Sequence, residues 1–234
     1  MNVVLPVTEG KGVGMINKED FTFFRERVSF VSELTAGGML QWAQSITRVV
    51  YEKGTQIRDG EGMLLLKSGI VRFFLRSQEE KELSLYRLRF GEICVTTDVG
   101  ITQYNSPNLH IEVESACETL RIDSVSFTLL CGSTSAARLF FSKLLNNRLF
   151  VSTQTMEKAL FNSLEQRIAL FLLEEPVGGD DSIVMTHTQL AHHIGCAREA
   201  ATRALDVIGR TGSVDLARGC IHILDRAGLR KLIA

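Results

Sequence analysis

The sequence of 234 residues lacks the marks of several broad classes of protein. No apolar run reaches the roughly 18 residues that a helix needs to cross a bilayer. The first 14 residues show neither the basic-then-apolar profile nor the small-residue cleavage site of a signal peptide. The composition, with 45% apolar and 23% charged residues, is that of an ordinary globular protein. It excludes a disordered tail and a collagen-like fibre, and we expect a cytoplasmic protein without membrane contact.

Cysteine is sparse and scattered along the chain. None of the five cysteines forms a C-x-x-C pair, which argues against a disulfide framework and against an iron–sulfur cluster with grouped ligands. Thiol reactivity depends on a local pKa that the sequence does not give, so a redox role stays open for Cys94, Cys117 and Cys131. The other two cysteines are Cys196 and Cys220.

An excess of charge of either sign is also absent, since 26 basic and 27 acidic side chains give a net charge of −1. The two parts of the chain nevertheless differ. Residues 186–234 hold seven Arg or Lys and four Asp or Glu, which gives +3. Residues 1–185 hold 19 basic and 23 acidic residues, which gives −4. A basic C-terminal part is typical of a protein that binds nucleic acid there.

Apolar periodicity divides the chain into helical and strand-like parts. Residues 17–46 repeat apolar side chains at steps of three and four, which predicts helix. Residues 48–122 hold short β-branched and aromatic runs separated by glycine, which predicts an antiparallel sandwich or roll with tight turns at Gly69 and Gly91. The expected strands are 49–51, 63–66, 71–75, 83–88, 109–113 and 119–122.

A long helix is expected over residues 135–160, which contain neither proline nor glycine. Apolar or small residues recur on it at alternating steps of four and three, as in the seam of a two-stranded coiled coil. An amphipathic helix packed on its own β-roll would show a similar face, so both interpretations stay open. The expected dimer seam consists of Leu145, Leu149, Ser152, Met156 and Ala159.

Residues 162–234 are expected to form a second small domain, and 186–210 are its most informative stretch. Thr186 and Gln189 form a capping box that begins one short helix, and Gly195 ends that helix with a left-handed backbone. A second helix follows over 197–210, and two helices joined in this way form a helix-turn-helix unit. The residues expected to face inward are Leu190, Ile194, Ala201, Leu205 and Ile208.

Polar side chains near the start of the second helix can read DNA. In a helix that lies in the major groove, residues at this position reach base edges. Arginine pairs with guanine, and glutamate accepts a hydrogen bond from cytosine. An ordinary surface ion pair between Glu199 and Arg203 is the alternative interpretation. Residues 213–217 and 220–224 predict a hairpin wing. The expected DNA-binding residues are Arg198, Glu199, Thr202, Arg203, His187, Thr188 and Arg218.

The stretch Gly195-Cys196-Ala197-Arg198-Glu199, with Arg203 four residues later, resembles the recognition helix of the Crp/Fnr family of bacterial transcription regulators. Gly69 and Gly91-Glu92 stand where that family has turns. The resemblance implies an α+β fold in three parts. These are a double-stranded β-helix (jelly-roll-like) sensor domain at 1–134, a dimerisation helix at 135–161 and a winged helix-turn-helix domain at 162–234.

The resemblance also implies partners. It implies a homodimer on palindromic double-stranded DNA, with TGTGA-like half-sites about 34 Å apart, and RNA polymerase as a further partner. The chain departs from the family at Ala197 and Ala200, where serine and threonine are frequent. The first change loses a helix cap worth about 1 kcal/mol, and both remove phosphate contacts.

An effector pocket in the β-roll is a further implication of the resemblance. Relatives that bind cyclic nucleotides grip the phosphate with an arginine, but residues 106–110 contain none, which argues against such a ligand held in that way. Haem would need an axial ligand, which His110 or Cys94 could supply. Single residues of these types usually belong to the core or the surface and bind no ligand. No cofactor is identified, and the effector stays unknown. The expected pocket residues are Gly91, Glu92, Ile93, Cys94, Ser152 and Thr153.

Two other functions are open to test. A cupin-type metalloenzyme would need several histidines and a carboxylate around one metal, but the roll contains only His110, so we expect no enzyme and no metal site. The other alternative is a ligand-binding or dimerisation module whose winged helix contacts protein. The salt dependence of DNA binding distinguishes this module from a DNA-binding protein, because counterion release makes the affinity for DNA fall steeply as the salt concentration rises.

Overall fold

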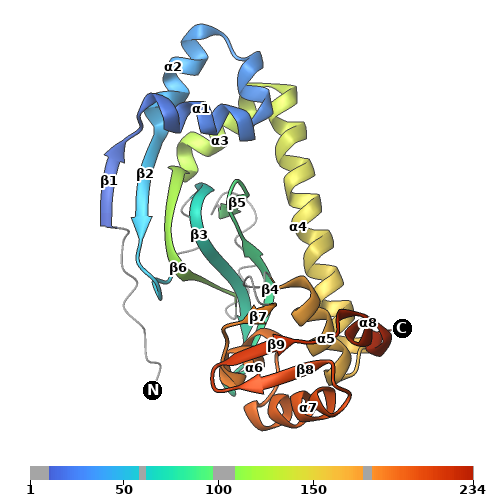
Figure 1. Ribbon diagram of the computed structural model, residues 1–234. Helices are drawn as coiled ribbons and strands as arrows, with labels where there is room; N and C mark the ends of the chain where they lie inside the picture. Colours follow the sequence, from blue (N-terminus) through green and yellow to red (C-terminus); the bar gives the residue numbers. More distant parts are fainter. Residues whose placement is uncertain (1–10, 58–61, 97–108, 176–180, 234) are drawn as a thin grey trace. The chain divides into compact units, whose positions relative to one another are not determined.

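The computed structural model describes residues 11–57, 62–96, 109–175 and 181–233 (Figure 1). The chain folds as two compact units. The first comprises Met1–Phe73 and Tyr86–Val151, and the second comprises Phe74–Leu85 and Ser152–Ala234. In the part of the chain that is described, no helix has both the length and the apolar character needed to span a bilayer.

A six-stranded sheet forms the frame of the first unit, and the ends of two of its strands, within Phe74–Leu85, belong to the second unit. The strand order is β1-β2-β6-β3-β4, and β5 pairs with β3 outside this path. β2 and β6 are antiparallel, from Ile46 opposite Ile122 to Tyr51 opposite Cys117. β-branched residues are frequent in β2, which suits a pleated and half-buried surface. The strands are β1 (Lys11–Met15), β2 (Ile46–Tyr51), β3 (Gly62–Arg76), β4 (Glu82–Leu88), β5 (Ile93–Thr96) and β6 (Leu109–Ile122).

β3 and β6 are longer than the sequence predicts. The sequence predicts two strands in each, with a tight turn at Gly69, but β3 is continuous over 15 residues and β6 over 14. The predicted turn at Gly69 is therefore wrong. Gly69 has a φ of +81°, and a Cβ there would lie 2.4 Å from the Ala116 carbonyl oxygen and 2.6 Å from the Cys117 Cβ. The glycine allows the backbone of β6 to approach closely instead of reversing the chain.

The turn predicted at Gly91 is confirmed between β4 and β5. Gly91 has a φ of +77°, and its N–H donates to the Leu66 carbonyl oxygen at 2.8 Å. Glu92 donates its N–H to the Arg89 carbonyl oxygen at 3.0 Å, and its carboxylate accepts from the Arg89 N–H at 2.7 Å. The side chain of Glu92 therefore helps to close its own turn.

The helix predicted over 17–46 forms as three shorter pieces. They are α1 (Lys18–Arg27), the 3-10 helix η1 (Ser29–Glu33) and α2 (Ala36–Ser45). Val28 leaves helical geometry with φ −108° and ψ 81°, and Thr35 caps a new start by accepting from the Gly38 N–H. A hydroxyl that caps the backbone in this way favours a helix start over continuation of the preceding helix.

Two further helices follow the sheet: α3 (Ser124–Ser133) and α4 (Ser135–Phe161). α4 confirms the predicted long helix. Phenylalanine rings pack α3, α4 and η1 together, with Phe141 5.6 Å from Phe30 and 4.7 Å from Phe127 between centroids, both edge to face. A second cluster of buried side chains comes mostly from the strands of the sheet. It includes Tyr51, Leu64, Leu66, Phe73, Leu88, Val113 and Cys117.

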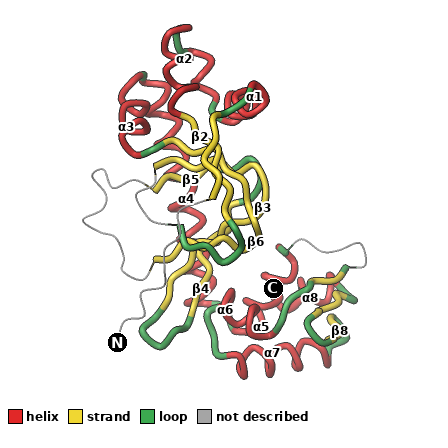
Figure 2. Tube along the Cα trace, turned by 90° about the vertical axis from the view of Figure 1, so that its left-hand side faces the viewer, coloured by secondary structure: helices red, strands yellow, loops and turns green. Residues whose placement is uncertain are grey.

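The second unit contains the elements predicted for a winged helix-turn-helix, together with one strand that the sequence analysis missed. Figure 2 shows α6 and α7 as separate helices joined by a short loop. The missed strand, β7, has two residues and pairs with β9 in a sheet of order β7-β9-β8. Residues 176–180, between α5 and β7, lie outside the described residues. The elements are α5 (Leu164–Glu174), β7 (Ser182–Ile183), α6 (His187–Ile194), α7 (Arg198–Arg210), β8 (Val214–Ala217), β9 (Cys220–Ile223) and α8 (Arg226–Ile233).

A partly buried charge network fixes α1 to the sheet. Lys67 Nζ lies 2.5 Å from both Asp20 Oδ1 and Glu118 Oε1, and Arg48 Nη2 lies 2.7 Å from Glu118 Oε2. Asp20 is only 1% exposed. Burial alone would raise the pKa of Asp20, but the hydrogen bonds from Lys67 and Asn17 and the nearby charges hold it below its usual value. The same balance with Lys67 and Arg48 lowers the pKa of Glu118.

We predict that Lys67→Gln lowers the free energy of unfolding by about 2 kcal/mol, because it leaves the buried Asp20 carboxylate without its cation. Denaturant unfolding at pH 7, followed by circular dichroism, measures the loss. Lys53→Gln removes an exposed lysine and is the matched control, with an expected change below about 0.5 kcal/mol.

The same network predicts a pH dependence. The pKa values of Asp20 and Glu118 are lower in the folded chain than their usual 3.8 and 4.5, so the stabilisation is present above those values. It is lost as the pH falls through the lower folded values. The stabilities of the wild-type protein and of Lys67→Gln should therefore converge as the pH is taken below 3.8. A difference between them that does not depend on pH would contradict this account.

Candidate nucleic-acid interface

The start and the end of α6 are fixed by local chemistry, as predicted. Thr186 accepts the Gln189 N–H at 3.2 Å, and the Gln189 side chain accepts the Thr186 N–H at 2.9 Å, which completes the capping box. At the other end Gly195 has φ 78° and ψ 43°, and its N–H donates to the Ala191 carbonyl oxygen. The left-handed backbone at Gly195 turns the chain directly into α7.

The inner face of α7 is fully buried. Ala201, Leu205 and Ile208 are each 0% exposed. Leu205 and Ile208 belong to one core with Leu190, Ile194 and residues of α5 and the wing. This confirms the residues predicted to face inward. Because the apolar side of α7 is fixed in this core, its rotation about its own axis is fixed as well.

The outer face of α7 presents the predicted charged residues to solvent. Arg198, Glu199 and Arg203 are all exposed. The N-cap residue Ala197 makes no side-chain hydrogen bond, so the start of α7 has no side-chain cap. Within the part of the chain that is described, no Glu199–Arg203 ion pair is formed. The unpaired guanidinium and carboxylate groups are free to meet an external partner.

Thr202 differs from Arg198, Glu199 and Arg203 because its side chain is already hydrogen-bonded within the protein. It donates to the Arg198 carbonyl oxygen at 3.0 Å and lies 3.0 Å from His187 Nδ1. His187 begins α6, so this contact joins the starts of the two helices. Thr202 is half-buried, and its geometry fits a role in positioning the helices better than a role in contacting bases.

The wing is an antiparallel hairpin, with Val214 opposite Ile223 and Ala217 opposite Cys220. Gly219 has a φ of +75° in the turn, and Arg218 beside it is exposed. Thr188 is also exposed, at the start of α6. The side chains predicted to meet DNA thus come from the two helix starts and the wing of one unit, and their contact with DNA stays a prediction.

This region matches a known domain family. Residues 166–232 match the family model described as the Crp-like helix-turn-helix domain. A solved structure from Eubacterium rectale, described as a transcriptional regulator of the Crp/Fnr family, is 28% identical with a TM-score of 0.81. The alignment covers 89% of this chain and 99% of that one. The resemblance to the Crp/Fnr family is confirmed.

Two further solved structures share the fold. One is the c-di-GMP-responsive global regulator CLP of Xanthomonas campestris, at 21% identity, a TM-score of 0.64 and coverage of 82% of this chain and 100% of that one. The other is FixK2 from Bradyrhizobium japonicum, at 18% identity, a TM-score of 0.65 and coverage of 81% and 98%. No curated protein matches the sequence. The chain has a Crp/Fnr-type regulator fold with a helix-turn-helix DNA-binding domain.

In the first unit, the turn at Glu92 has a basic partner that the sequence analysis missed. Arg148 on α4 donates to the Ile93 carbonyl oxygen at 3.2 Å and lies 3.5 Å from the Glu92 carboxylate. Its guanidinium also lies over the Tyr86 ring, 5.0 Å from the centroid. Arg148 stands one helical turn before Ser152, and that spacing is the signal that could have identified it.

The other residues predicted for an effector pocket lie in different surroundings. Ile93 and Cys94 are buried at 5% and 2% exposure, so their side chains belong to the core of the first unit. Ser152 is half-buried and Thr153 is exposed on α4, in the second unit. The stretch 106–108 lies outside the described residues. The effector pocket therefore stays a prediction.

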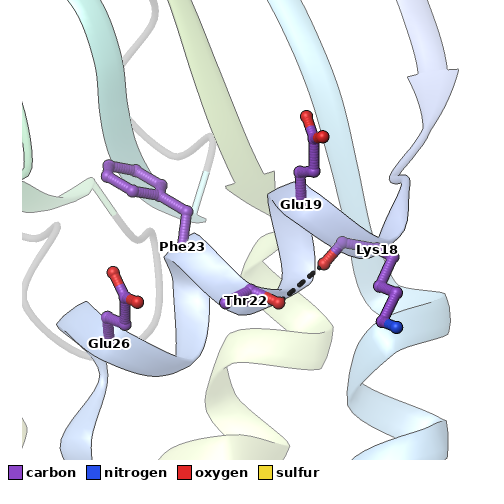
Figure 3. Close-up of a pocket in the computed structure, with 5 residues that line it drawn as sticks. All are labelled: Lys18, Glu19, Thr22, Phe23 and Glu26. Carbon is purple, nitrogen blue, oxygen red and sulfur yellow. Dashed lines mark hydrogen bonds between the residues drawn. The ribbon is translucent and has the colours of Figure 1, made fainter.

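A surface depression lies on α1, as Figure 3 shows. Thr22 Oγ1 donates to the Lys18 carbonyl oxygen at 2.9 Å within it. All of the lining residues belong to this one helix, so no second element encloses a small molecule there. The lining residues are Lys18, Glu19, Thr22, Phe23 and Glu26.

Burial weakens the case for thiol-based sensing at two of the cysteines. It raises the pKa of Cys117 and of Cys131 to about 11 in each case. At pH 7 only about one thiol in ten thousand would then be a thiolate, the reactive form. Among the described residues, no group of three or more His, Cys, Asp or Glu side chains is placed to hold a metal ion.

We predict that iodoacetamide at pH 7 labels Cys117 and Cys131 in the native protein more than about a hundredfold more slowly than an unperturbed cysteine with a pKa near 8.5. Peptide mass spectrometry after timed quenching measures both rates. Unfolding in urea should bring the two cysteines to the ordinary rate. Rapid labelling of native Cys117 would restore it as a candidate redox sensor.

Proposed function

We propose that this protein is a sequence-specific DNA-binding transcription regulator that acts as a homodimer on a palindromic operator. The observation that carries the proposal is the exposed set Arg198, Glu199 and Arg203 at the start of α7, behind a left-handed Gly195. Such a helix start is the part that enters the major groove in helix-turn-helix proteins. The proposal includes no enzymatic activity and a location in the cytoplasm.

The arrangement of α7 supports base reading over simple attraction to DNA. The guanidinium groups of Arg198 and Arg203 can each pair with guanine, and the Glu199 carboxylate can accept from a cytosine amino group. His187, Thr188 and Arg218 are the proposed contacts to sugar and phosphate, which would fix register without reading sequence.

We predict that Arg203→Ala weakens binding to a selected operator by about 1–3 kcal/mol, because one guanine contact is lost. Binding to a scrambled duplex should change much less. Fluorescence anisotropy with both duplexes measures the two affinities in the same buffer. Arg210→Ala removes an exposed arginine at the far end of the same helix and is the matched control.

Equal losses on operator and scrambled DNA would remove base reading from the proposal. The salt dependence of wild-type binding tests the alternative that the winged helix contacts protein. Specific DNA binding should fall steeply between 50 mM and 200 mM salt, since each phosphate contact releases counterions. Absence of DNA binding at low salt would favour the protein-binding alternative.

The exposed seam of α4 supports the homodimer. Leu145 is 43% exposed, Leu149 67% and Met156 48%, although each is an apolar residue on a helix of 27 residues. Ser152 and Ala159 complete the spacing of a two-stranded coiled coil. A second copy of the chain would cover this seam with an identical one and would supply the second recognition helix.

We predict that Leu149→Lys weakens dimerisation by about a hundredfold or more, because an ammonium group would be buried against the same residue of the partner. Analytical ultracentrifugation over a range of concentrations measures the dissociation constant. Asn147→Lys adds the same charge at an exposed position outside the seam and should leave the dimer intact. A wild-type monomer at micromolar concentration would contradict the proposed dimer.

An effector in the β-roll is part of the proposal, and its identity is open. The Glu92 turn and Ser152 and Thr153 are the proposed contacts. An effector acts only if it prefers one arrangement of the protein over another. Native mass spectrometry of freshly purified protein tests for a retained small molecule. Recruitment of RNA polymerase is proposed as the downstream step.

A further inference from the structure

The hairpin that joins β3 to β4 contacts the turn of the helix-turn-helix within the second unit. Leu83 at the start of β4 forms an antiparallel β-bridge with Ile194 at the end of α6. A strand residue thus pairs through its backbone with the last residue before Gly195. We call this contact region, formed by Glu82, Leu83 and Ser84 against residues 192–195, the hairpin latch.

A side-chain hydrogen bond reinforces the latch. Ser84 Oγ lies 2.8 Å from His193 Nδ1, and His193 is only 8% exposed. The His193 ring also stacks on Phe171 of α5, with centroids 5.3 Å apart and planes 19° apart. The imidazole therefore joins the hairpin to the core of the DNA-binding unit.

The Glu82 carboxylate makes a second side-chain contact between the hairpin and α6. Arg76 Nη2 holds the buried Glu82 carboxylate at 2.8 Å from within the hairpin. The other carboxylate oxygen of Glu82 lies 3.6 Å from His192 Nδ1 on α6. Arg76 thus orients Glu82 toward α6.

Gly195 serves the latch as well as the turn. A Cβ on this residue would lie 3.1 Å from Leu83 Cδ1 and 3.2 Å from Leu83 Cβ. The Leu83 side chain fits against the glycine backbone without a gap for a methyl group. The residue that sets the angle between α6 and α7 is therefore also the surface on which the hairpin rests.

The latch stands at one end of a continuous strand. β4 runs from Glu82 to Leu88 and leads to the Gly91-Glu92 turn at its other end. Beside the latch, the Leu85 carbonyl oxygen accepts a hydrogen bond from Thr155 Oγ1 of α4 at 2.9 Å. One short strand thus connects the turn that we propose for effector binding with the turn that precedes the recognition helix.

We propose that the hairpin latch fixes the direction of the helix-turn-helix so that two recognition helices can engage two half-sites at once. The inference rests on the proposed DNA-binding function and adds the residues that orient the DNA-binding unit. The latch leaves Arg198, Glu199 and Arg203 exposed, so a closed latch is compatible with DNA contact. A unit held in place in advance loses less conformational freedom when it binds.

The test compares two DNA probes with full-length protein. The first probe is a palindromic duplex selected from a random-sequence pool with the wild-type protein, and the second contains one half of it. Ser84→Ala removes the latch hydroxyl, and His193→Phe keeps the ring on Phe171 but removes the ring nitrogens. Each variant should bind the palindrome at least fivefold more weakly and the half-site within twofold of wild type.

The double variant decides whether the two residues act through one contact. If they do, Ser84→Ala with His193→Phe should be no weaker on the palindrome than the weaker single variant. Glu79→Gln changes an exposed residue of the same hairpin that pairs with Lys81, and it is the matched control. It should bind both probes within twofold of wild type.

Hydrogen exchange gives a readout that does not depend on DNA. In Ser84→Ala, the amides at the end of α6 should exchange at least fivefold faster than in wild type, because the latch no longer restrains them. Equal exchange would overturn the proposal, since the contact would not hold α6 in solution.

The binding outcomes separate the latch from the proposed function. A wild-type protein that selects no duplex would refute the DNA-binding function, and the exchange rates would still decide whether the latch forms. Unchanged or tighter palindrome binding by the two variants, with a wild type that does bind, would overturn the latch alone. Equal losses on the palindrome and the half-site would also overturn it, because the damage would then lie within the winged helix.

Discussion

The left-handed backbone at Gly195 is the constraint on which the recognition surface depends. A residue with a Cβ would pay roughly 1–2 kcal/mol to adopt this conformation, and its Cβ would also press on Leu83. The turn sets where α7 begins, and the burial of Ala201 and Leu205 sets how α7 is rotated. Together they leave Arg198 and the neighbouring charged residues on the outside. The direction of these side chains thus follows from one backbone angle and one apolar face.

The sequence predicts the second unit well because its signals are local. A capping box, a glycine and a helical apolar period all act within a few residues, and each appears at the predicted place. The errors in the first unit come from contacts between distant segments. Gly69 resembles a turn residue in sequence, but its neighbours in space are Ala116 and Cys117, almost fifty positions away. β7 was missed because two residues are too short to show any period.

The surroundings of Glu92 in the first unit show the same limit of sequence-based prediction. Residues 106–110, where relatives that bind cyclic nucleotides carry an arginine, contain no arginine. The helix α4 nevertheless brings the guanidinium of Arg148 to 3.5 Å from the Glu92 carboxylate. A charged group in a half-buried turn needs a partner of opposite charge, and the fold supplies it from a helix more than fifty residues away. The fold therefore supplies a partner of opposite charge for Glu92, and a comparison of short sequence motifs does not reveal that partner.

The free energy of the hairpin latch has the magnitude expected of a regulated contact. One side-chain hydrogen bond contributes about 0.5–1.5 kcal/mol, and a partly exposed contact such as the 3.6 Å approach of Glu82 to His192 contributes less than about 1 kcal/mol. Coupling energies between sites in allosteric proteins are typically about 1–3 kcal/mol. A contact much stronger than this would hold the DNA-binding unit permanently, and one much weaker would not restrain it at all. The latch therefore lies in the range where the binding energy of the proposed effector, at the far end of β4, would be large enough to open or close it.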